Sequence, residues 1–187
     1  MTFLDKIIHY DKELFQFLNS LGNETWDSFW ILVTNQFSWV PLFVVLLFLV
    51  VKAYGWKKSL LIIFIVALLV TFSDQFVNFI KDYYGRLRPN NDPSINEFTR
   101  VLKRSGGFSF VSGHATTSFA VSVFLILTLK QYYKYTLLLL IWPILFAYSR
   151  IYVGVHYPVD IFSGMLLGIF IGTIFYKISL LFLKKLE

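Results

Sequence analysis

The chain has 187 residues, of which 57% are hydrophobic, 20% aromatic and only 15% charged. Soluble domains are usually about 45–50% apolar and about 25% charged, so this composition indicates a protein embedded in lipid. The length suits a single domain over residues 1–187. The lack of cysteine excludes disulfides and thiolate metal sites. The net charge of +6 comes from basic residues at the ends of apolar runs, which favours phospholipid headgroups over nucleic acid as partners.

Residues 1–22 predict an amphipathic helix rather than a cleavable signal peptide, because charged residues interrupt every apolar run. Its apolar residues fall at helical spacing on one side, at Leu4, Ile7, Ile8, Leu14, Phe15 and Leu18. Such a helix lies either at the membrane surface or against a helical bundle. The sequence leaves both arrangements open.

Five apolar segments then approach or reach the roughly 20 residues that a membrane helix needs. They cover residues 27–52, 56–81, 113–130, 135–150 and 158–182. The first has a polar interruption around Asn35, and the fourth is short and depends on Trp142 and flanking tyrosines at the interface. We therefore expect an all-α integral membrane bundle of about five transmembrane helices over residues 27–182, with residues 1–22 as an N-terminal interfacial helix.

Residues 89–111 form the long connection between these segments and are rich in turn formers. Loops of this length in a compact domain are usually functional or disordered. With five spans, this loop must lie on the side where the second and fourth helices end and the third and fifth begin. Every strong chemical motif of the sequence falls at one of those four ends.

The first motif runs Lys81-Asp-Tyr-Tyr-Gly-Arg86-Leu-Arg88-Pro89 and places three cations at a helix end. Alone it is explained equally well by basic side chains reaching lipid headgroups. The second motif, Val111-Ser112-Gly113-His114, opens a helix whose free N–H groups favour an anion. Alone it is explained by Ser112 as an ordinary helix cap.

The third motif runs Ser149-Arg150-Ile-Tyr-Val-Gly-Val-His156-Tyr-Pro158-Val-Asp160. His156 and Asp160 are four residues apart and share a helix face if the first turn includes His156. A carboxylate bonded to one ring nitrogen would orient the imidazole and leave the other nitrogen free to attack. Together, two histidines, a carboxylate and several cations at one membrane face are the parts that phosphoryl transfer requires.

These motifs resemble the three-part signature of the type 2 phosphatidic acid phosphatase family, which also includes vanadium haloperoxidases. That signature is Lys, six residues, Arg-Pro; then Pro-Ser-Gly-His; then Ser-Arg, five residues, His, three residues, Asp. The spacings within the first and third parts match fully, and Val111 stands where the family usually has proline. The resemblance covers roughly residues 56–182.

The resemblance implies that His156 attacks phosphorus and becomes a phosphohistidine, while Asp160 orients it and His114 protonates the leaving oxygen and then activates water. The residues that it implies for binding the phosphoryl oxygens are Lys81, Arg88, Ser112, Gly113 and Arg150. It also implies catalysis without a metal or other cofactor. The sequence itself contains no His, Glu and Asp set with evident metal-ligand spacing.

We expect the substrate to be a lipid phosphate or diphosphate, either undecaprenyl diphosphate or a glycerophospholipid phosphate such as phosphatidylglycerol phosphate or phosphatidic acid. Lipid A is the alternative substrate. A non-catalytic lipid-phosphate-binding membrane protein and a vanadium-dependent halide oxidase are the rival functions. The expected partners are this lipid and the bilayer, with no nucleic acid and no obligate protein partner.

The expected location is a bacterial inner membrane, with the site facing the periplasm or the exterior. The balance of Lys and Arg between the two sides favours this orientation by eight to six, once the cations implied to bind phosphate are set aside.

Two further features carry weaker expectations. Asp74 lies inside the second apolar segment, where an acid is costly, and a structural ion pair with a basic neighbour is the favoured interpretation. Three basic residues of the long loop either hold a second phosphate or are simply solvated: Arg100, Lys103 and Arg104. In the last segment glycines recur every four residues, at Gly164, Gly168 and Gly172, which predicts close helix packing.

Overall fold

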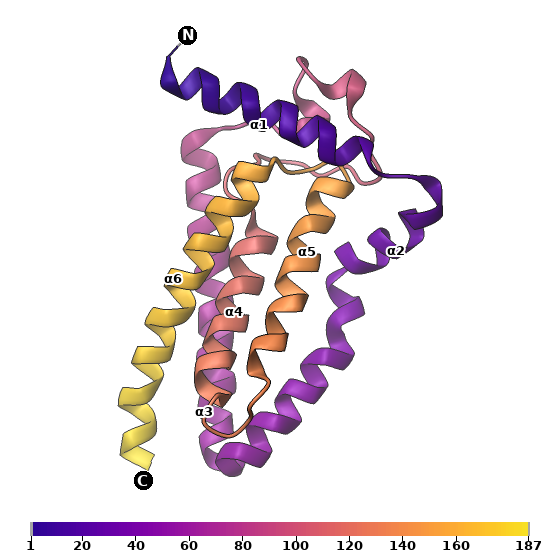
Figure 1. The fold of residues 1–187 in the computed structure, drawn as a ribbon. Coiled ribbons are helices and arrows are strands. Elements are labelled where there is room, and N and C mark those ends of the chain that lie inside the picture. Colours follow the sequence, from indigo (N-terminus) through magenta and orange to yellow (C-terminus); the bar gives the residue numbers. More distant parts are fainter. Residues whose placement is uncertain (1, 187) are drawn as a thin grey trace.

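The computed structural model describes residues 2–186, and within that range the chain is helical, with no strand. Its α-helices are α1 (Phe3–Ser20), α2 (Glu24–Thr34), α3 (Val40–Tyr84), α4 (Gly113–Leu129), α5 (Ile141–Tyr152) and α6 (Pro158–Leu183). Short 3₁₀ helices occupy Gln36–Trp39, Pro89–Asn91, Asn96–Phe98, Thr136–Leu140 and Lys184–Leu186. Figure 1 shows α3 to α6 as an elongated bundle with α1 lying across one end. The predicted all-α class is confirmed.

The segment expected to form one helix over residues 27–52 is broken in two near Asn35. The prediction of a single continuous helix is therefore wrong. Asn35 ends α2, and its side chain accepts a hydrogen bond of 3.1 Å from the N–H of Phe37. Asparagine side chains compete with helix hydrogen bonds in this way, which explains why the polar interruption stops the helix. The indole of Trp39 then donates to the carbonyl of Val33 over 2.9 Å and holds the bend.

The next segment, α3, changes direction at Gly55. That residue has φ 71° and ψ 169°, a backbone conformation that glycine adopts at little cost because it has no Cβ. Residues 40–54 and 56–84 are therefore two helical segments joined at a sharp turn. They correspond to the second part of the first expected helix and to the second expected helix.

Two helical stretches among the described residues are long and apolar enough to cross a membrane, namely Gln36–Asn91 and Pro158–Leu183. Gly113–Leu129 and Thr136–Tyr152 are shorter apolar helices. Large apolar side chains point outward from the long stretches: Phe48, Phe64 and Phe170 are each at least 60% exposed. An extended apolar exterior of this kind suits lipid better than water.

The centre of the bundle is α4, which packs against α3, α5 and α6 and is mostly buried. Close approach of α6 depends on the glycines. A Cβ on Gly168 would lie 2.4 Å from the carbonyl oxygen of Thr116, and one on Gly172 would lie 2.4 Å from that of Ala120. The predicted close packing is confirmed, and it holds the first turns of α4 and α6 side by side.

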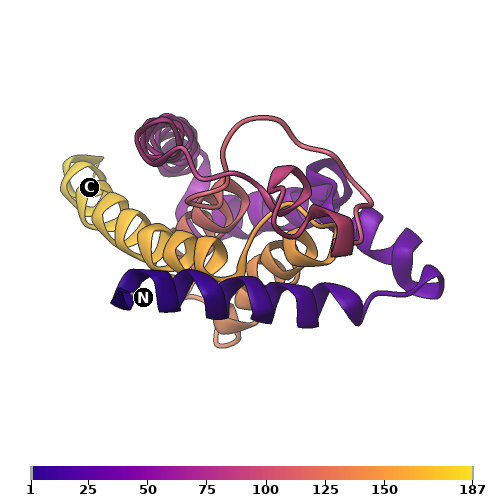
Figure 2. The same ribbon diagram turned by 90° about the horizontal axis from the view of Figure 1, so that it is seen from above.

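Of the two arrangements open for the N-terminal helix, the structure shows α1 packed on the bundle, across the end of α5 and the start of α6 (Figures 1 and 2). Phe15 and Asn19 face inward and are almost fully buried. The Asn19 amide donates to the carbonyl of Ile151 over 3.0 Å, and its oxygen accepts a 2.8 Å bond from the N–H of Arg100. Thus α1 is fixed to both the bundle and the long loop.

The loop over residues 89–111 contains only short 3₁₀ helices, as its composition predicts, and is tied down by ion pairs. Asp92 lies 2.7 Å from the ammonium of Lys12 and accepts a 2.9 Å hydrogen bond from the hydroxyl of Tyr157. The guanidinium of Arg100 binds Asp27 of α2. Arg100 is therefore a brace between the loop and α2 rather than a freely solvated side chain.

Replacement of Gly168 by leucine is expected to force α6 away from α4, because the new side chain has no room beside Thr116. Overpacking of this kind costs about 1–3 kcal/mol, so the unfolding temperature in detergent should fall by several degrees. Gly106→Ala is the control, since no atom lies within 4 Å of its would-be Cβ. Equal unfolding temperatures for the two variants would contradict this account of the packing.

Candidate active site

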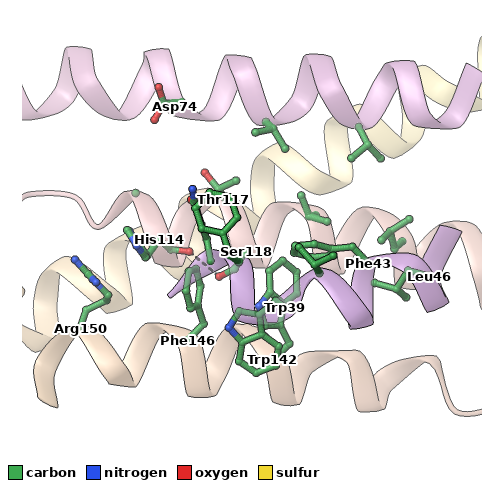
Figure 3. Close-up of a pocket in the computed structure, with 18 of the residues that line it drawn as sticks. Trp39, Phe43, Leu46, Asp74, His114, Thr117, Ser118, Trp142, Phe146 and Arg150 are labelled. Carbon is green, nitrogen blue, oxygen red and sulfur yellow. Dashed lines mark hydrogen bonds between the residues drawn. The ribbon is translucent and has the colours of Figure 1, made fainter. Parts of the chain in front are cut away.

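The predicted meeting of four helix ends is present in the structure. Lys81 near the end of α3, His114 at the start of α4, Arg150 near the end of α5 and His156 just before α6 all line one cavity. Arg88, directly before the long loop, lines it as well. The cavity has a volume of about 880 Å³, and Figure 3 shows part of its wall. Both histidines thus lie on the same side of the bundle and face the same space.

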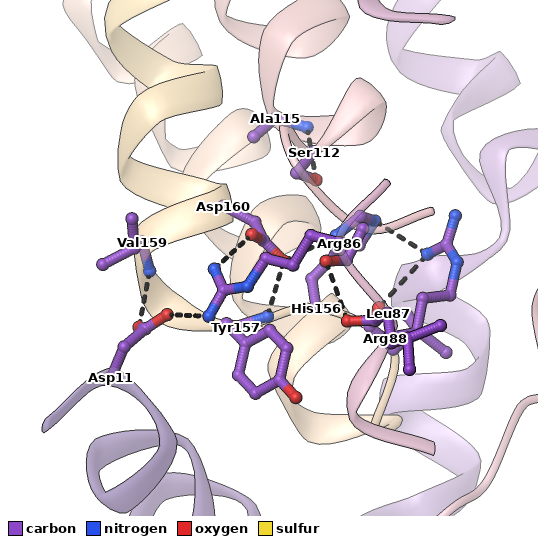
Figure 4. Close-up of polar contacts among 12 residues, drawn as sticks. Asp11, Arg86, Leu87, Arg88, Ser112, Ala115, His156, Tyr157, Val159 and Asp160 are labelled. Atoms are coloured by element: carbon purple, nitrogen blue, oxygen red, sulfur yellow. Dashed lines mark hydrogen bonds and ion pairs between the residues drawn. The ribbon is translucent and has the colours of Figure 1, made fainter. Parts of the chain in front are cut away.

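The imidazole of His156 is held from both sides (Figure 4). Its Nδ1 lies 3.3 Å from Oδ2 of Asp160, and its Nε2 lies 3.1 Å from Nη1 of Arg88. A guanidinium only donates, so Nε2 must be the unprotonated nitrogen, and Nδ1 carries the proton that it donates to Asp160. In this tautomer the lone pair that can attack is on Nε2, the ring nitrogen on the side away from Asp160.

Burial also keeps the His156 ring neutral. Only 1% of the residue is exposed, and desolvation lowers the pKa of His156 from its ordinary 6.5 to about 4, although Asp160 acts in the opposite direction. A neutral imidazole keeps one unprotonated nitrogen and is a nucleophile, whereas a protonated one is not. The ring is therefore competent to attack over the whole range near neutral pH.

Asp160 is a hub of hydrogen bonds at the first turn of α6. Besides His156, its carboxylate accepts a 2.9 Å bond from the N–H of Tyr157 and a 2.8 Å bond from Nη1 of Arg86. Its backbone carbonyl accepts a 3.0 Å bond from the N–H of Ser112, which precedes α4. One residue thus joins the starts of α4 and α6 to the end of α3.

Sequence reasoning assigned no role to Arg86 and none to Asp11, yet both reach this hub (Figure 4). Nη2 of Arg86 lies 2.7 Å from the carboxylate of Asp11, which also accepts a 2.9 Å bond from the N–H of Val159. The guanidinium of Arg86 lies 4.0 Å from the ring centre of Tyr157. A signal for Asp11 exists in the sequence: it falls on the apolar stripe of its helix, where an acid needs a buried partner.

Three cations face the cavity without a carboxylate of their own. Lys81, Arg88 and Arg150 form no ion pair among residues 2–186, although Arg88 and Arg150 are at most 5% exposed. Nη1 of Arg150 donates to the hydroxyl of Thr34 over 2.6 Å, but its buried Nε has no partner in the described chain. Buried charges are normally paired, so this arrangement indicates a site for an anion.

The other two residues implied to bind phosphate differ from one another. Gly113 lines the cavity, and a Cβ at this position would lie 3.8 Å from Nζ of Lys81. Ser112 is fully buried behind the wall, where its hydroxyl accepts a 3.4 Å bond from the N–H of Ala115 and caps α4. The structure therefore groups Gly113 with the cations, whereas Ser112 supports the helix that begins there.

Asp74 does not form the expected ion pair. Its carboxylate accepts a 3.3 Å hydrogen bond from Asn78, and none of the ion pairs within residues 2–186 includes it. It lines the same cavity as the histidines. The described residues also contain no group of three His, Asp or Glu side chains placed to hold a metal ion. Lys81, Arg88 and Arg150 supply positive charge to the wall of this cavity.

We expect nitrogen NMR of histidine-labelled protein in detergent to show His156 as the neutral ring protonated on Nδ1. Because the pKa of His156 is lowered to about 4, its signals should keep their neutral values when the pH falls from 7.5 to 5.5. The signals of His156 are identified as those that are absent from the spectrum of the His156→Asn variant. A His156 ring that becomes protonated near pH 6.5 would contradict the geometry described above.

An all-helical bundle with an apolar exterior, a cationic cavity and two facing histidines defines a membrane hydrolase of phosphate esters. Residues 58–183 match the PAP2 superfamily, and the chain belongs to that family. The resemblance drawn from the three motifs is thus confirmed, and the protein is a lipid phosphatase.

Known relatives agree with this assignment. The chain is 35% identical to the lipid A 4'-phosphatase of Bacteroides thetaiotaomicron, over 90% of this chain and 76% of that protein. It is 29% identical to the undecaprenyl-diphosphatase of Sulfolobus acidocaldarius, over 92% of this chain and 80% of that protein. Its fold matches the crystal structure of a transmembrane PAP2 type phosphatidylglycerolphosphate phosphatase from Bacillus subtilis, with a TM-score of 0.72 at 18% identity over 97% and 88% of the two chains.

Proposed function

We propose that the protein hydrolyses a lipid-borne phosphate in two steps. Nε2 of His156 attacks phosphorus, the bond to the lipid oxygen breaks, and His114 gives a proton to that oxygen as it leaves. His114 then takes a proton from water, the resulting hydroxide attacks phosphorus, and the P–N bond breaks. Inorganic phosphate leaves, and both histidines return to their starting states.

The observation that carries this proposal is the junction of His156 with unpaired cations at one cavity. Lys81, Arg88 and Arg150 supply positive charge where the equatorial oxygens of the phosphoryl group would lie, which is the main requirement of phosphoryl transfer. Asp160 fixes the tautomer and direction of His156. The N-terminus of α4 at Gly113, held by Ser112, adds N–H groups that favour an anion. The route uses no metal.

We further propose five membrane crossings, made by residues 27–52, 56–81, 113–130, 135–150 and 158–182, in a bacterial inner membrane. The bend at Gln36–Trp39 and the 3₁₀ helix Thr136–Leu140 would then lie inside the first and fourth crossings. The active-site end, covered by α1, would face the periplasm or the exterior. The lysines near the turns at the opposite end, among them Lys57 and Lys134, support this orientation.

The substrate that we favour is a lipid A-type phosphate. The cavity continues from the histidines between apolar side chains that include Trp39, Phe43 and Leu46, which suits a lipid tail. The relative from Bacteroides thetaiotaomicron is named for lipid A, and it supports this order of preference over undecaprenyl diphosphate. Undecaprenyl diphosphate is the second candidate, because the relative from Sulfolobus acidocaldarius is named for it.

Purified protein in detergent should release inorganic phosphate from at least one of lipid A, undecaprenyl diphosphate and phosphatidic acid. His156→Asn should lower kcat at least about 10³-fold on that substrate, because the nucleophile is lost. His9→Asn is the matched control, since the His9 side chain is 55% exposed on α1 and lies beside Glu13. Full activity of His156→Asn would refute the mechanism.

A further inference from the structure

The cavity changes character with depth along α3. Its lining residues on this helix pass from the cation Lys81 to the carboxylate of Asp74 and then to branched apolar side chains, beginning with Val70. Asp74 is seven residues from Lys81, which corresponds to roughly 10 Å along a helix axis. Asp74 therefore lies beyond the phosphate-binding group, between it and the apolar part of the cavity.

The opposite wall changes in the same order. On α4 the lining residues pass from His114 to Thr117 and Ser118 and then to Val121. Gln36, at the bend before α3, lines the cavity too. Figure 3 shows Asp74 on one side of the cavity and His114 and Thr117 on the other. Together these side chains form a band of polar groups, which we call the polar band: Asp74, Thr117 and Gln36.

The carboxylate of Asp74 has few hydrogen-bond donors around it. An ionised carboxylate accepts only, through two oxygens with about four lone-pair sites. Within residues 2–186, the one side chain that donates to Asp74 is Asn78, over 3.3 Å. Asp74 is exposed, and its remaining acceptor sites are open to a ligand in the cavity that it lines. A donor that arrives on the ligand would satisfy it, next to a phosphate held by the cations.

We propose that Asp74 is a specificity-determining residue that accepts a hydrogen bond from a hydroxyl or amide N–H carried by the substrate beside its phosphate. This rests on the proposed phosphatase function and names the substrate class: a phosphate on an acylated amino sugar. Such a head group carries hydroxyl and amide donors between the phosphate and the acyl chains. Thr117 and Gln36 can complement it, because hydroxyl and amide side chains both donate and accept.

Prenyl diphosphates and phosphatidic acid differ from this substrate class because they carry no such donor beside the phosphate. A prenyl diphosphate places hydrocarbon directly after the phosphates and offers no donor at the level of the polar band. Phosphatidic acid offers ester oxygens there, which accept only and are repelled by a carboxylate. Both would cover the carboxylate of Asp74 without offering it a donor, and removing a carboxylate from water without a hydrogen bond disfavours a substrate.

The test measures kcat/KM for phosphate release from lipid A, undecaprenyl diphosphate and dioleoyl phosphatidic acid in one detergent. Wild-type protein is expected to prefer lipid A. Asp74→Ala should lower kcat/KM on lipid A at least about tenfold, because a hydrogen bond to a charged group is lost. Values for the other two lipids should stay within about twofold. Asp74→Asn keeps an acceptor oxygen of the same shape and should retain more activity on lipid A than Asp74→Ala.

Asp82→Ala is the matched control, because Asp82 is exposed on the same helix and does not line the cavity. It should change none of the three values. Equal losses on all three lipids, or no loss on lipid A, would overturn the role of Asp74. Preference of wild-type protein for either donor-free lipid would overturn the substrate class while the phosphatase function stands. Wild-type protein that releases phosphate from none of the lipids would instead refute the proposed function itself.

Discussion

Asp160 receives hydrogen bonds from the imidazole of His156, the guanidinium of Arg86 and the backbone of Tyr157. Its backbone carbonyl binds the N–H of Ser112 at the start of α4. A fully buried carboxylate is tolerated only when it is satisfied in this way. Because these partners come from three separate parts of the chain, satisfying one carboxylate also fixes the geometry of the cavity. In the proposed mechanism the same contact orients the nucleophile, so folding and catalysis depend on a single group.

The apolar body and this polar end constrain each other. Inside the bundle, small residues let α4 and α6 approach closely, and Gly168 and Gly172 have no space for a side chain. That approach places the first turn of α6 beside the first turn of α4, which is what allows Asp160 to reach Ser112. At the end of the bundle, α1 covers the hub through Asp11 and Arg86. The N-terminal helix is therefore part of the support of the site rather than a separate surface element.

The spacing of the motifs was sufficient to predict which side chains would meet. The four-residue separation of His156 and Asp160 gave their contact, and the number of apolar segments gave the common side of the four helix ends. The helix ends do meet at one cavity, and the contact of His156 with Asp160 follows from helix periodicity, which is a local property of the sequence. The five membrane crossings themselves stay a prediction.

Contacts between distant residues could not be predicted in the same way. The pairing of Arg86 with Asp11 joins residues that only the completed fold brings together, and the motif spacing contains no information about it. The break at Asn35 and the turn at Gly55 depend on a side-chain hydrogen bond and on a left-handed backbone. The absence of an ion pair at Asp74 among the described residues also required the structure, because an acid in a helix is equally compatible with an ion pair and with a cavity wall.

The most direct test of the central claim is to trap the covalent intermediate during a single turnover of a radiolabelled lipid phosphate. The reaction is quenched in base, in which phosphohistidine is stable, and the labelled peptide is mapped. Because Asp160 holds the proton of His156 on Nδ1, the account predicts phosphate on Nε2 of His156. Label on Nδ1, label on His114, or turnover without any labelled histidine would contradict it.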